Sequence, residues 1–200
     1  MHHDAQHARR TKHGAGVRAS RGRAFTLLEL LVCVAVIGVL AGLVAGAARH
    51  AVHASHRAVC ANNLRWLHGA VAAYMQDHRE TLPWAVDPYS LAWDRHDPVE
   101  AIAPYLDVAA PFIDEEDVVV TGQPWECPAS REVAGRHGSS YDYPPHRLML
   151  KHGRTRVTRF HAASPWQPIW MDREFDAHPG AGKMAARFDG AVGRWSELRR

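Results

Sequence analysis

The feature that most constrains this chain is an apolar run near its N-terminus. Residues 30–48 carry no charged side chain over 19 positions. A helix that rises ~1.5 Å per residue would extend this run to ~28 Å, close to the ~30 Å hydrocarbon core of a bilayer. Gly38, Gly42 and Gly46 place small residues on one stripe, where a second helix can approach closely. The run therefore predicts a helix in a membrane or in the core of a helical assembly.

Glu29 lies immediately before this run. Its charge helps to decide between the possible functions of the apolar segment. A carboxylate deep in a bilayer costs ~2.5–3.5 kcal/mol on insertion scales. A cleaved secretory signal is one alternative, because a basic stretch precedes the run and residues 45–47 resemble a small-residue cleavage site. A plain membrane anchor is the second alternative. Neither of them gives Glu29 a purpose.

The positive charge of the chain is concentrated in its first residues. Residues 1–24 hold six of the 24 Lys and Arg side chains and one of the 21 acidic ones. The rest of the chain is slightly acidic, which argues against nucleic-acid binding. By the positive-inside tendency, residues 1–24 stay in the cytoplasm and the C-terminal part crosses the membrane.

The stretch "AFTLLEL" at residues 24–30 resembles the cleavage and methylation signature of type IV prepilins and type II secretion pseudopilins. The resemblance implies that prepilin peptidase cuts between Ala24 and Phe25, and that the new N-terminal Phe25 is N-methylated. Ala24 stands where the family usually has glycine. Glu29 would then meet the α-ammonium group of a neighbouring copy and set the axial register, because a buried charge without a partner is costly.

The helical pattern continues past the apolar run. Apolar residues recur at helical spacing from Cys60 to Met75, and Pro83 follows. We predict one helix over residues 26–79. The predicted organisation is a basic leader (1–24), a transmembrane or filament-core helix (25–48), its amphipathic continuation (49–80) and a β-rich globular domain (81–200). The resemblance implies an α+β fold, a pilin-like ladle whose long helix packs on a small antiparallel sheet.

The globular part shows strand and turn signals. Residues 118–121 are β-branched and end at Gly122. Residues 147–151 and 156–160 predict one hairpin, and residues 183–188 and 191–195 predict another. The second hairpin turns at Asp189-Gly190, which suits a type I′ turn. The seven tryptophans are expected to fill much of the core.

Three further stretches are similar to pseudopilin-like proteins of planctomycete-type bacteria. They are residues 60–84, residues 125–145, and a C-terminal element that contains His178 and Asp189-Gly190. Outside the cytoplasm, Cys60 and Cys127 could form one disulfide; two buried thiols are the alternative. A structural role for His178 is favoured over an acid–base pair with Asp172 or Asp189.

Other candidate sites have weaker patterns. His50, His53 and His56 recur every third residue, and the interpretation favoured is a polar helix surface without a metal. Residues 114–117 are four consecutive carboxylates, and some pseudopilins hold calcium in a loop. The favoured interpretation is a solvated loop, so no cofactor is predicted. The hydrolase and phosphate-loop motifs are lacking, and no catalytic residue is assigned.

The sequence therefore predicts a structural subunit rather than an enzyme. It would reside in the inner membrane as a single-pass protein with a periplasmic C-terminal domain. Its expected partners are prepilin peptidase, other pseudopilin subunits, the inner-membrane assembly platform and membrane lipid, in a type II secretion or type IV pilus-like system. The alternative is a membrane-anchored ligand-binding module that retains a pilin-type N-terminus.

Overall fold

The computed structural model describes residues 25–85, 98–175, 177–180 and 182–200. The chain divides into two units, of which the first ends at Val44 and the second runs from Ala45 to Arg200. The predicted leader, including Ala24, lies outside the described residues.

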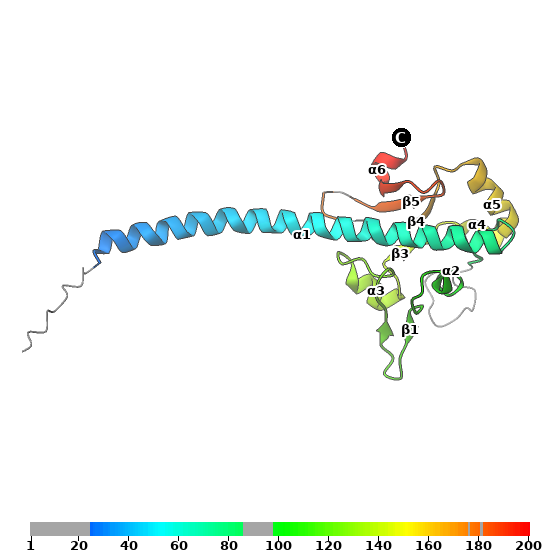
Figure 1. Cartoon of the computed structure of the whole chain (residues 1–200), viewed down its shortest axis with the longest axis horizontal. Coiled ribbons are helices and arrows are strands. Elements are labelled where there is room, and N and C mark those ends of the chain that lie inside the picture. Colours follow the sequence, from blue (N-terminus) through cyan, green and yellow to red (C-terminus); the bar gives the residue numbers. More distant parts are fainter. Residues whose placement is uncertain (1–24, 86–97, 176, 181) are drawn as a thin grey trace, which may run out of the picture. The chain divides into compact units, whose positions relative to one another are not determined.

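A single helix dominates the N-terminal part of the chain (Figure 1). Helix α1 spans Leu27–Asp77, 51 residues, which confirms the predicted long helix. It ends where Arg79 and Glu80 take left-handed backbone conformations, with φ of 54° and 58°, and Pro83 follows. Proline cannot continue a helix because it lacks a backbone N–H.

The core of the second unit is built on a four-stranded antiparallel sheet in the order β3-β4-β5-β6. The strands are β3 (Tyr141–Asp142), β4 (Pro168–Asp172), β5 (Met184–Arg187) and β6 (Val192–Arg194). Trp170 and Tyr141 of this sheet belong to the same buried cluster as Leu64 and Leu67 of α1. The fold is α+β, as predicted, and the sheet is small and antiparallel.

The C-terminal hairpin is confirmed, but its turn differs from the prediction. Strands β5 and β6 pair around Asp189-Gly190. The N–H of Gly190 donates to the carbonyl of Arg187 at 3.1 Å, and Arg187 N–H donates to the carbonyl of Ala191 at 2.9 Å. Only Gly190 has positive φ here, at 88°. This is a three-residue loop closed by a left-handed glycine, whereas a type I′ turn requires positive φ at two positions.

The hairpin predicted over residues 147–160 is wrong. The structure has two helices there, α4 (His146–His152) and α5 (Arg154–Ala163), separated by Gly153 with φ of 75°. Helix α5 buries Val157 and His161, which are four residues apart and share one helix face. The sequence predicted two strands here, but burial follows the helical period.

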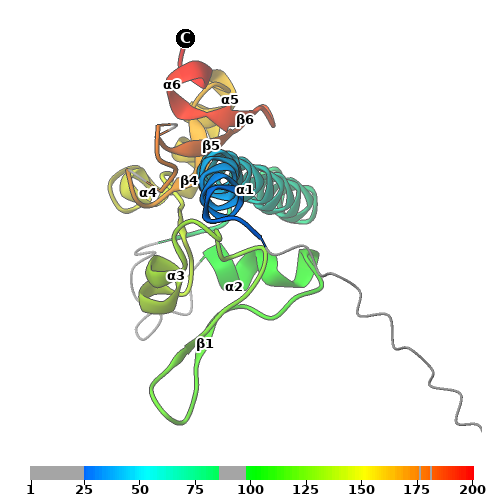
Figure 2. The same cartoon turned by 90° about the vertical axis from the view of Figure 1, so that its left-hand side faces the viewer.

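The remaining elements flank the C-terminal half of α1. They are α2 (Pro98–Ile102), the 3₁₀-helix η1 (Ala103–Tyr105), β1 (Phe112–Ile113), β2 (Val119–Val120), α3 (Arg131–His137) and α6 (Trp195–Leu198). Both views place α2, α3 and β1 on one side of this half of α1, and α5 and α6 on the other (Figure 1 and Figure 2). Strand β2 confirms the β-branched signal near residue 119.

The tryptophans fill the core only in part. Trp125 and Trp170 are each 1% exposed, whereas Trp66 and Trp166 are 49% and 47% exposed. The two buried rings come from the segment before α3 and from the central strand β4. Tertiary position, and not residue type, therefore decides which tryptophans contribute to the core.

Candidate functional site

The start of α1 carries the predicted processing and assembly residues. Thr26 immediately precedes the first helical residue, Leu27. The N–H and the hydroxyl of Thr26 both donate to Oε2 of Glu29, at 2.9 and 3.0 Å. The N–H of Glu29 donates in return to Oγ1 of Thr26 at 3.2 Å. This reciprocal pair is a capping box, so Glu29 closes the first turn of its own helix. This capping role of Glu29 was not predicted from the sequence.

The capping box leaves one oxygen of Glu29 available. Oε1 accepts no hydrogen bond from the residues that the structure describes. Phe25, the predicted first residue of the processed chain, directly precedes the capping box and is 79% exposed. A negative charge at a helix N-terminus is also favoured by the helix dipole. The geometry thus holds a carboxylate in place while one acceptor remains free.

The first half of α1 presents an apolar surface to its surroundings. All residues from 25 to 55 are exposed, and the helix is long and apolar enough to cross a membrane. Removing each large aliphatic side chain from water is worth ~1.5–3 kcal/mol. The exposed large apolar residues of α1 within the first unit are Leu27, Leu28, Leu30, Leu31, Val32, Val34, Val36, Ile37, Val39, Leu40, Leu43 and Val44. Such a helix fits a single-pass membrane anchor.

The glycine stripe on this half of α1 is open. A Cβ atom added at Gly38, Gly42 or Gly46 would meet no described atom within 4 Å. Nothing in the described part of the chain therefore packs against these positions. Small residues at spacing four allow another helix backbone to come close.

A disulfide joins Cys60 and Cys127, the two cysteines of the second unit. Both side chains are 0% exposed, and their Cα atoms are 5.2 Å apart. One turn along α1, the amide of Asn63 donates to the carbonyl of Glu126 at 2.9 Å. Cys60 and Asn63 therefore tie the buried face of α1 to one segment before α3. Cys33 is an exposed free thiol.

A buried acid–base pair lies beside the disulfide. His178 Nε2 is 3.4 Å from Asp172 Oδ2 and 3.7 Å from Cys127 Sγ. The side chains of His178 and Asp172 are almost fully buried, at 2% and 0% exposure. Burial raises the pKa of Asp172 to about 7. The N–H of Met184, which donates to Asp172 Oδ2 at 2.7 Å, lowers this pKa and offsets only part of the effect of burial. Between about pH 4 and pH 7 both side chains are therefore mainly neutral.

The pKa of His178 is lowered to about 4. Burial is the main cause, and the charges of Arg57, His56 and His53 act in the same direction. His53 and His56 thus act electrostatically on this buried ring, while His50 is exposed. Asp189 instead forms an ion pair with Arg187, and no described contact joins it to His178.

The arrangement around His178 resembles a metal site by distance alone. The Cys60 and Cys127 sulfurs and one His178 nitrogen all lie within 4.8 Å of one another. A cysteine ligates metal as the thiolate, and disulfide-bonded sulfurs carry no such charge. In its oxidised form this cluster therefore does not fit a metal ion, and His178 packs against the disulfide.

The acidic loop organises its own backbone. Asp114 Oδ1 accepts the N–H of Glu116 at 3.0 Å and the N–H of Val118 at 2.9 Å. Asp117 has positive φ, at 59°. Asp114 thus closes the turn between β1 and β2, as short acidic side chains commonly do. The loop forms the tip of a hairpin.

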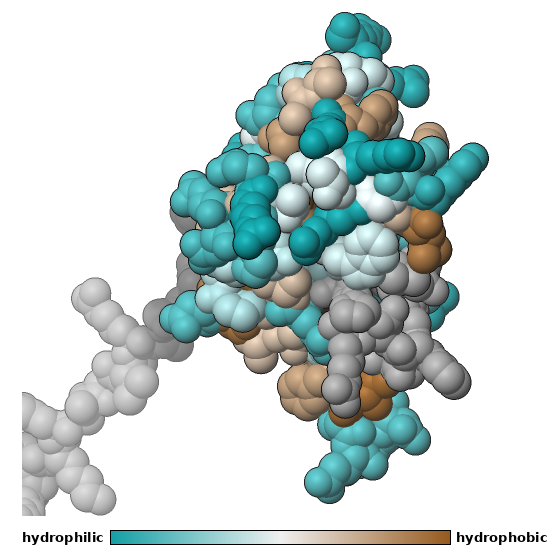
Figure 3. Space-filling model, turned by 90° about the vertical axis from the view of Figure 1, so that its right-hand side faces the viewer, coloured by the Kyte–Doolittle hydropathy of each residue, from teal (hydrophilic) through white to brown (hydrophobic). Residues whose placement is uncertain are grey.

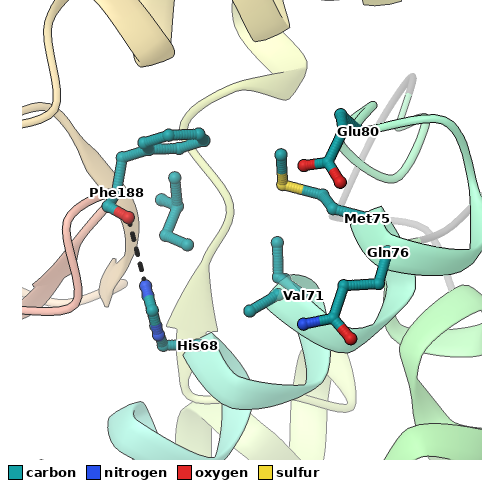
Figure 4. Close-up of a pocket in the computed structure, with 8 residues that line it drawn as sticks. His68, Val71, Met75, Gln76, Glu80 and Phe188 are labelled. Carbon is teal, nitrogen blue, oxygen red and sulfur yellow. Dashed lines mark hydrogen bonds between the residues drawn. The ribbon is translucent and has the colours of Figure 1, made fainter.

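A pocket of about 330 Å³ opens between α1 and the β5–β6 turn (Figure 4). Val71, Met75 and Phe188 give it apolar walls, and Gln76 and Glu80 place polar groups at one side. His68 Nε2 and the Phe188 carbonyl lie 3.2 Å apart and link the helix to the turn. This pocket was not predicted from the sequence, because its walls come from α1 and from β4 and the β5–β6 turn, which are far apart in the chain.

Comparison with known proteins identifies only the N-terminal segment. Residues 20–45 match the prokaryotic N-terminal methylation motif, and this range contains Ala24, Phe25 and Glu29. No curated protein and no solved structure matches the chain. The motif supports the identification of the chain as a type IV pilin-like or pseudopilin precursor. It implies processing by prepilin peptidase and assembly with pilin-type subunits. It indicates a structural subunit. The resemblance of the C-terminal His178 and Asp189 element lies outside the matched range.

Proposed function

We propose that this chain is the precursor of a structural subunit of a type II secretion or type IV pilus-like filament. The observation that carries the proposal is the coincidence of two features at one end of α1. The methylation motif spans residues 20–45, and the exposed apolar surface of α1 begins within the same range. A processing signal followed by an uncovered apolar helix is what a subunit needs to move from a membrane into a helical filament.

The proposed processing step creates the group that Glu29 requires. Prepilin peptidase cuts the peptide bond between Ala24 and Phe25, and the new α-amino group of Phe25 is methylated. The methylated amine remains positively charged at neutral pH. It lies directly before the capping box, at the N-terminus of α1. Each processed subunit therefore carries a cation and a carboxylate within its first five residues.

In the assembled filament, Oε1 of Glu29 would meet the ammonium group of a neighbouring copy. Two unit charges 4 Å apart attract by ~1 kcal/mol in water and by ~4 kcal/mol at an effective dielectric constant of 20. The capping box supports this because Thr26 fixes the carboxylate through Oε2 and leaves Oε1 to a partner. The apolar side chains supply most of the association energy, and the charge pair selects the axial register.

The cysteines support a C-terminal domain outside the cytoplasm. Disulfides persist in oxidising compartments such as the bacterial periplasm. The Cys60–Cys127 disulfide lies in the second unit, whereas the free Cys33 lies in the apolar half of α1. We accordingly place the chain in the inner membrane as a single-pass protein, with residues 1–24 in the cytoplasm and the globular domain in the periplasm.

The test is expression of the full chain in cells that contain prepilin peptidase and an assembly platform. Intact-mass and N-terminal analysis of the membrane-extracted protein should give a chain that begins at methylated Phe25. A chain that still carries residues 1–24, or one that begins near Arg49, would contradict the proposal. The second outcome would instead indicate ordinary secretion.

Substitution of Glu29 separates its charge from its capping role. Glutamine can replace glutamate in a capping box, so Glu29→Gln retains the helix cap and removes the charge. We expect Glu29→Gln to insert normally and to lose at least roughly tenfold in filament yield, which corresponds to about 1.4 kcal/mol. Thr26→Val, which removes the capping hydroxyl and leaves the charge, should reduce yield much less. Normal yield from Glu29→Gln together with reduced yield from Thr26→Val would show that the cap, and not the charge, matters.

A ligand-binding module on a pilin-type anchor remains the second candidate. The pocket between His68 and Phe188 is the observation that favours it, because it combines apolar walls with Gln76 and Glu80. Saturable binding of a glycan or another small molecule to the purified full chain, abolished by Met75→Trp, would support this alternative. Normal filament yield from the same variant would show that the pocket serves no assembly role.

A further inference from the structure

The hairpin β1–β2 is an apolar projection with an acidic tip. Phe112 and Val120 are directly paired, so they share one face, and they are 50% and 38% exposed. Ile113 and Val118 are 41% and 55% exposed. Figure 3 shows hydrophobic side chains directly above a hydrophilic tip at the lower end of the molecule, where Figure 1 places this hairpin. An exposed two-stranded hairpin of this kind is an unprotected pair of strand edges.

The tip of this hairpin carries four carboxylates without cationic partners. Residues 114–117 are all acidic, and no ion pair joins any of them to a residue in the described part of the chain. The carboxylate of Asp114 accepts the hydrogen bonds that close the turn. The side chains of Glu115, Glu116 and Asp117 are exposed to solvent. The hairpin therefore offers an apolar stem followed by a concentrated negative charge.

A second surface has the opposite charge and a matching apolar character. Helices α4 and α5 enclose a pocket of about 330 Å³ lined by Leu148, His152, Arg156, Val157 and Phe160. Phe160 is 43% exposed. The walls are mostly apolar, and the pocket opens to the surface. Such a concave apolar site is a typical place for a partner side chain.

Cations without ion pairs in the described residues lie on the two helices that form this pocket, and Arg156 lines it. Lys151, Arg156 and Arg159 are exposed, and no ion pair connects them to the residues that the structure describes. With Arg154 they give the segment that forms α4 and α5 an excess of positive charge, and no acidic residue lies between 143 and 171. A partner that supplies both apolar side chains and negative charge would satisfy this face.

We propose that the β1–β2 hairpin of one copy docks into the α4–α5 pocket of a second copy of this chain. The apolar stem would fill the pocket, and the acidic tip would lie against Arg156 and Arg159. The two surfaces lie on opposite sides of the C-terminal half of α1 (Figure 1 and Figure 2), so one chain does not use its own hairpin in this way. A contact between two different surfaces leaves one of each free, and it extends as an open assembly wherever its rotation does not close a ring.

This inference deepens the proposed filament and rests on it for the alignment of neighbouring copies. The α1 interface would hold the copies together in the membrane, and the hairpin contact would link their periplasmic domains. Two weak contacts between the same copies reinforce each other, because the first raises the effective concentration for the second. The charges add selectivity against other subunits.

The test is cysteine cross-linking between two differently tagged full-length copies in membranes. In a Cys33→Ser background, one copy carries Glu116→Cys and the other carries Arg159→Cys. Arg65→Cys on α1 is the matched control, because Arg65 is also an exposed arginine without an ion pair in the described residues. We expect the 116–159 pair to give roughly tenfold more mixed dimer than the 116–65 pair. Equal yields would overturn the inference.

Charge reversal supplies a second measurement that does not depend on thiol geometry. Arg156→Glu with Arg159→Glu should reduce native dimer and oligomer yield on chemical cross-linking, and Glu115→Lys with Glu116→Lys should do the same. Mixing the two reversed copies should restore the yield, because the charges are complementary again. Failure to restore it, with both variants folded, would also overturn the inference.

A third probe separates this inference from the filament proposal. Native Cys33 lies in α1 and reports contact between neighbouring helices when the wild-type chain is oxidised. A Cys33 dimer without a 116–159 dimer would refute the hairpin contact and leave the filament standing. A 116–159 dimer without a Cys33 dimer would support the hairpin contact and refute the proposed contact between α1 helices. A cross-link from position 159 to a different polypeptide would show that another protein occupies the pocket and would overturn the inference.

Discussion

Loss of the Cys60–Cys127 disulfide should strongly destabilise the second unit. The two cysteines are 67 residues apart in sequence, and both are fully buried. A cross-link restricts the unfolded chain, and the loop-entropy relation for a loop of this length gives about 4 kcal/mol at 25 °C. For a domain of this size, that change lowers the melting temperature by roughly 8–16 °C. We expect this loss for Cys60→Ser combined with Cys127→Ser.

Guanidinium unfolding of the full chain in detergent micelles provides the assay, with fluorescence of the buried Trp125 and Trp170 as the signal. Each single serine variant should lose about as much stability as the double variant, because either one abolishes the bond. Cys33→Ser is the matched control and should leave unfolding of the second unit unchanged. A double variant within about 1 kcal/mol of wild type would refute the loop-entropy argument.

Two further predictions concern the pair beside the disulfide and the final hairpin. In wild type, the raised pKa of Asp172 lowers the free energy of unfolding as pH rises from about 4 to 7. The lowered pKa of His178 raises the free energy of unfolding from about pH 4 to 6.5. The two effects nearly cancel. Asp172→Asn should therefore make the melting temperature rise with pH across this range, and a flat profile in both proteins would contradict this. Gly190→Ala should cost about 1–2 kcal/mol of unfolding free energy, because φ is +88° and the added Cβ would lie 3.3 Å from His68 Cε1. Gly193→Ala, whose nearest contact is 3.7 Å, is the control and should cost much less.

The predictions that succeeded depend on local sequence. The length of α1 follows from an apolar and helical pattern that Pro83 ends. The β5–β6 hairpin follows from Asp189-Gly190, because glycine readily takes the positive φ that the turn requires. Both depend on neighbouring residues alone. For the same reason, the capping box of Thr26 and Glu29 could have been recognised from its spacing.

The predictions that failed depend on burial. Residues 147–160 contain β-branched and basic residues that fit either a strand or a helix. The core selects helices, because His146 and Met149 are buried three residues apart in α4, and Val157 and His161 are buried four residues apart in α5. The pair Asp172 and His178 could be suspected from sequence, but its placement against Cys127 required the sheet and the disulfide loop to form together.

The sequence by itself determined the methylation motif at residues 20–45, the place of Glu29 directly before the apolar run, and an apolar helix of membrane length. Backbone geometry and solvation act there over a few residues, so no distant contact is needed. Only the tertiary structure decided which distant groups meet. Contacts between residues far apart in the chain bury His178 beside Asp172, form the pocket at His68 and place the β1–β2 hairpin and α5 on opposite sides of α1. Local preferences do not specify which of these distant residues pair.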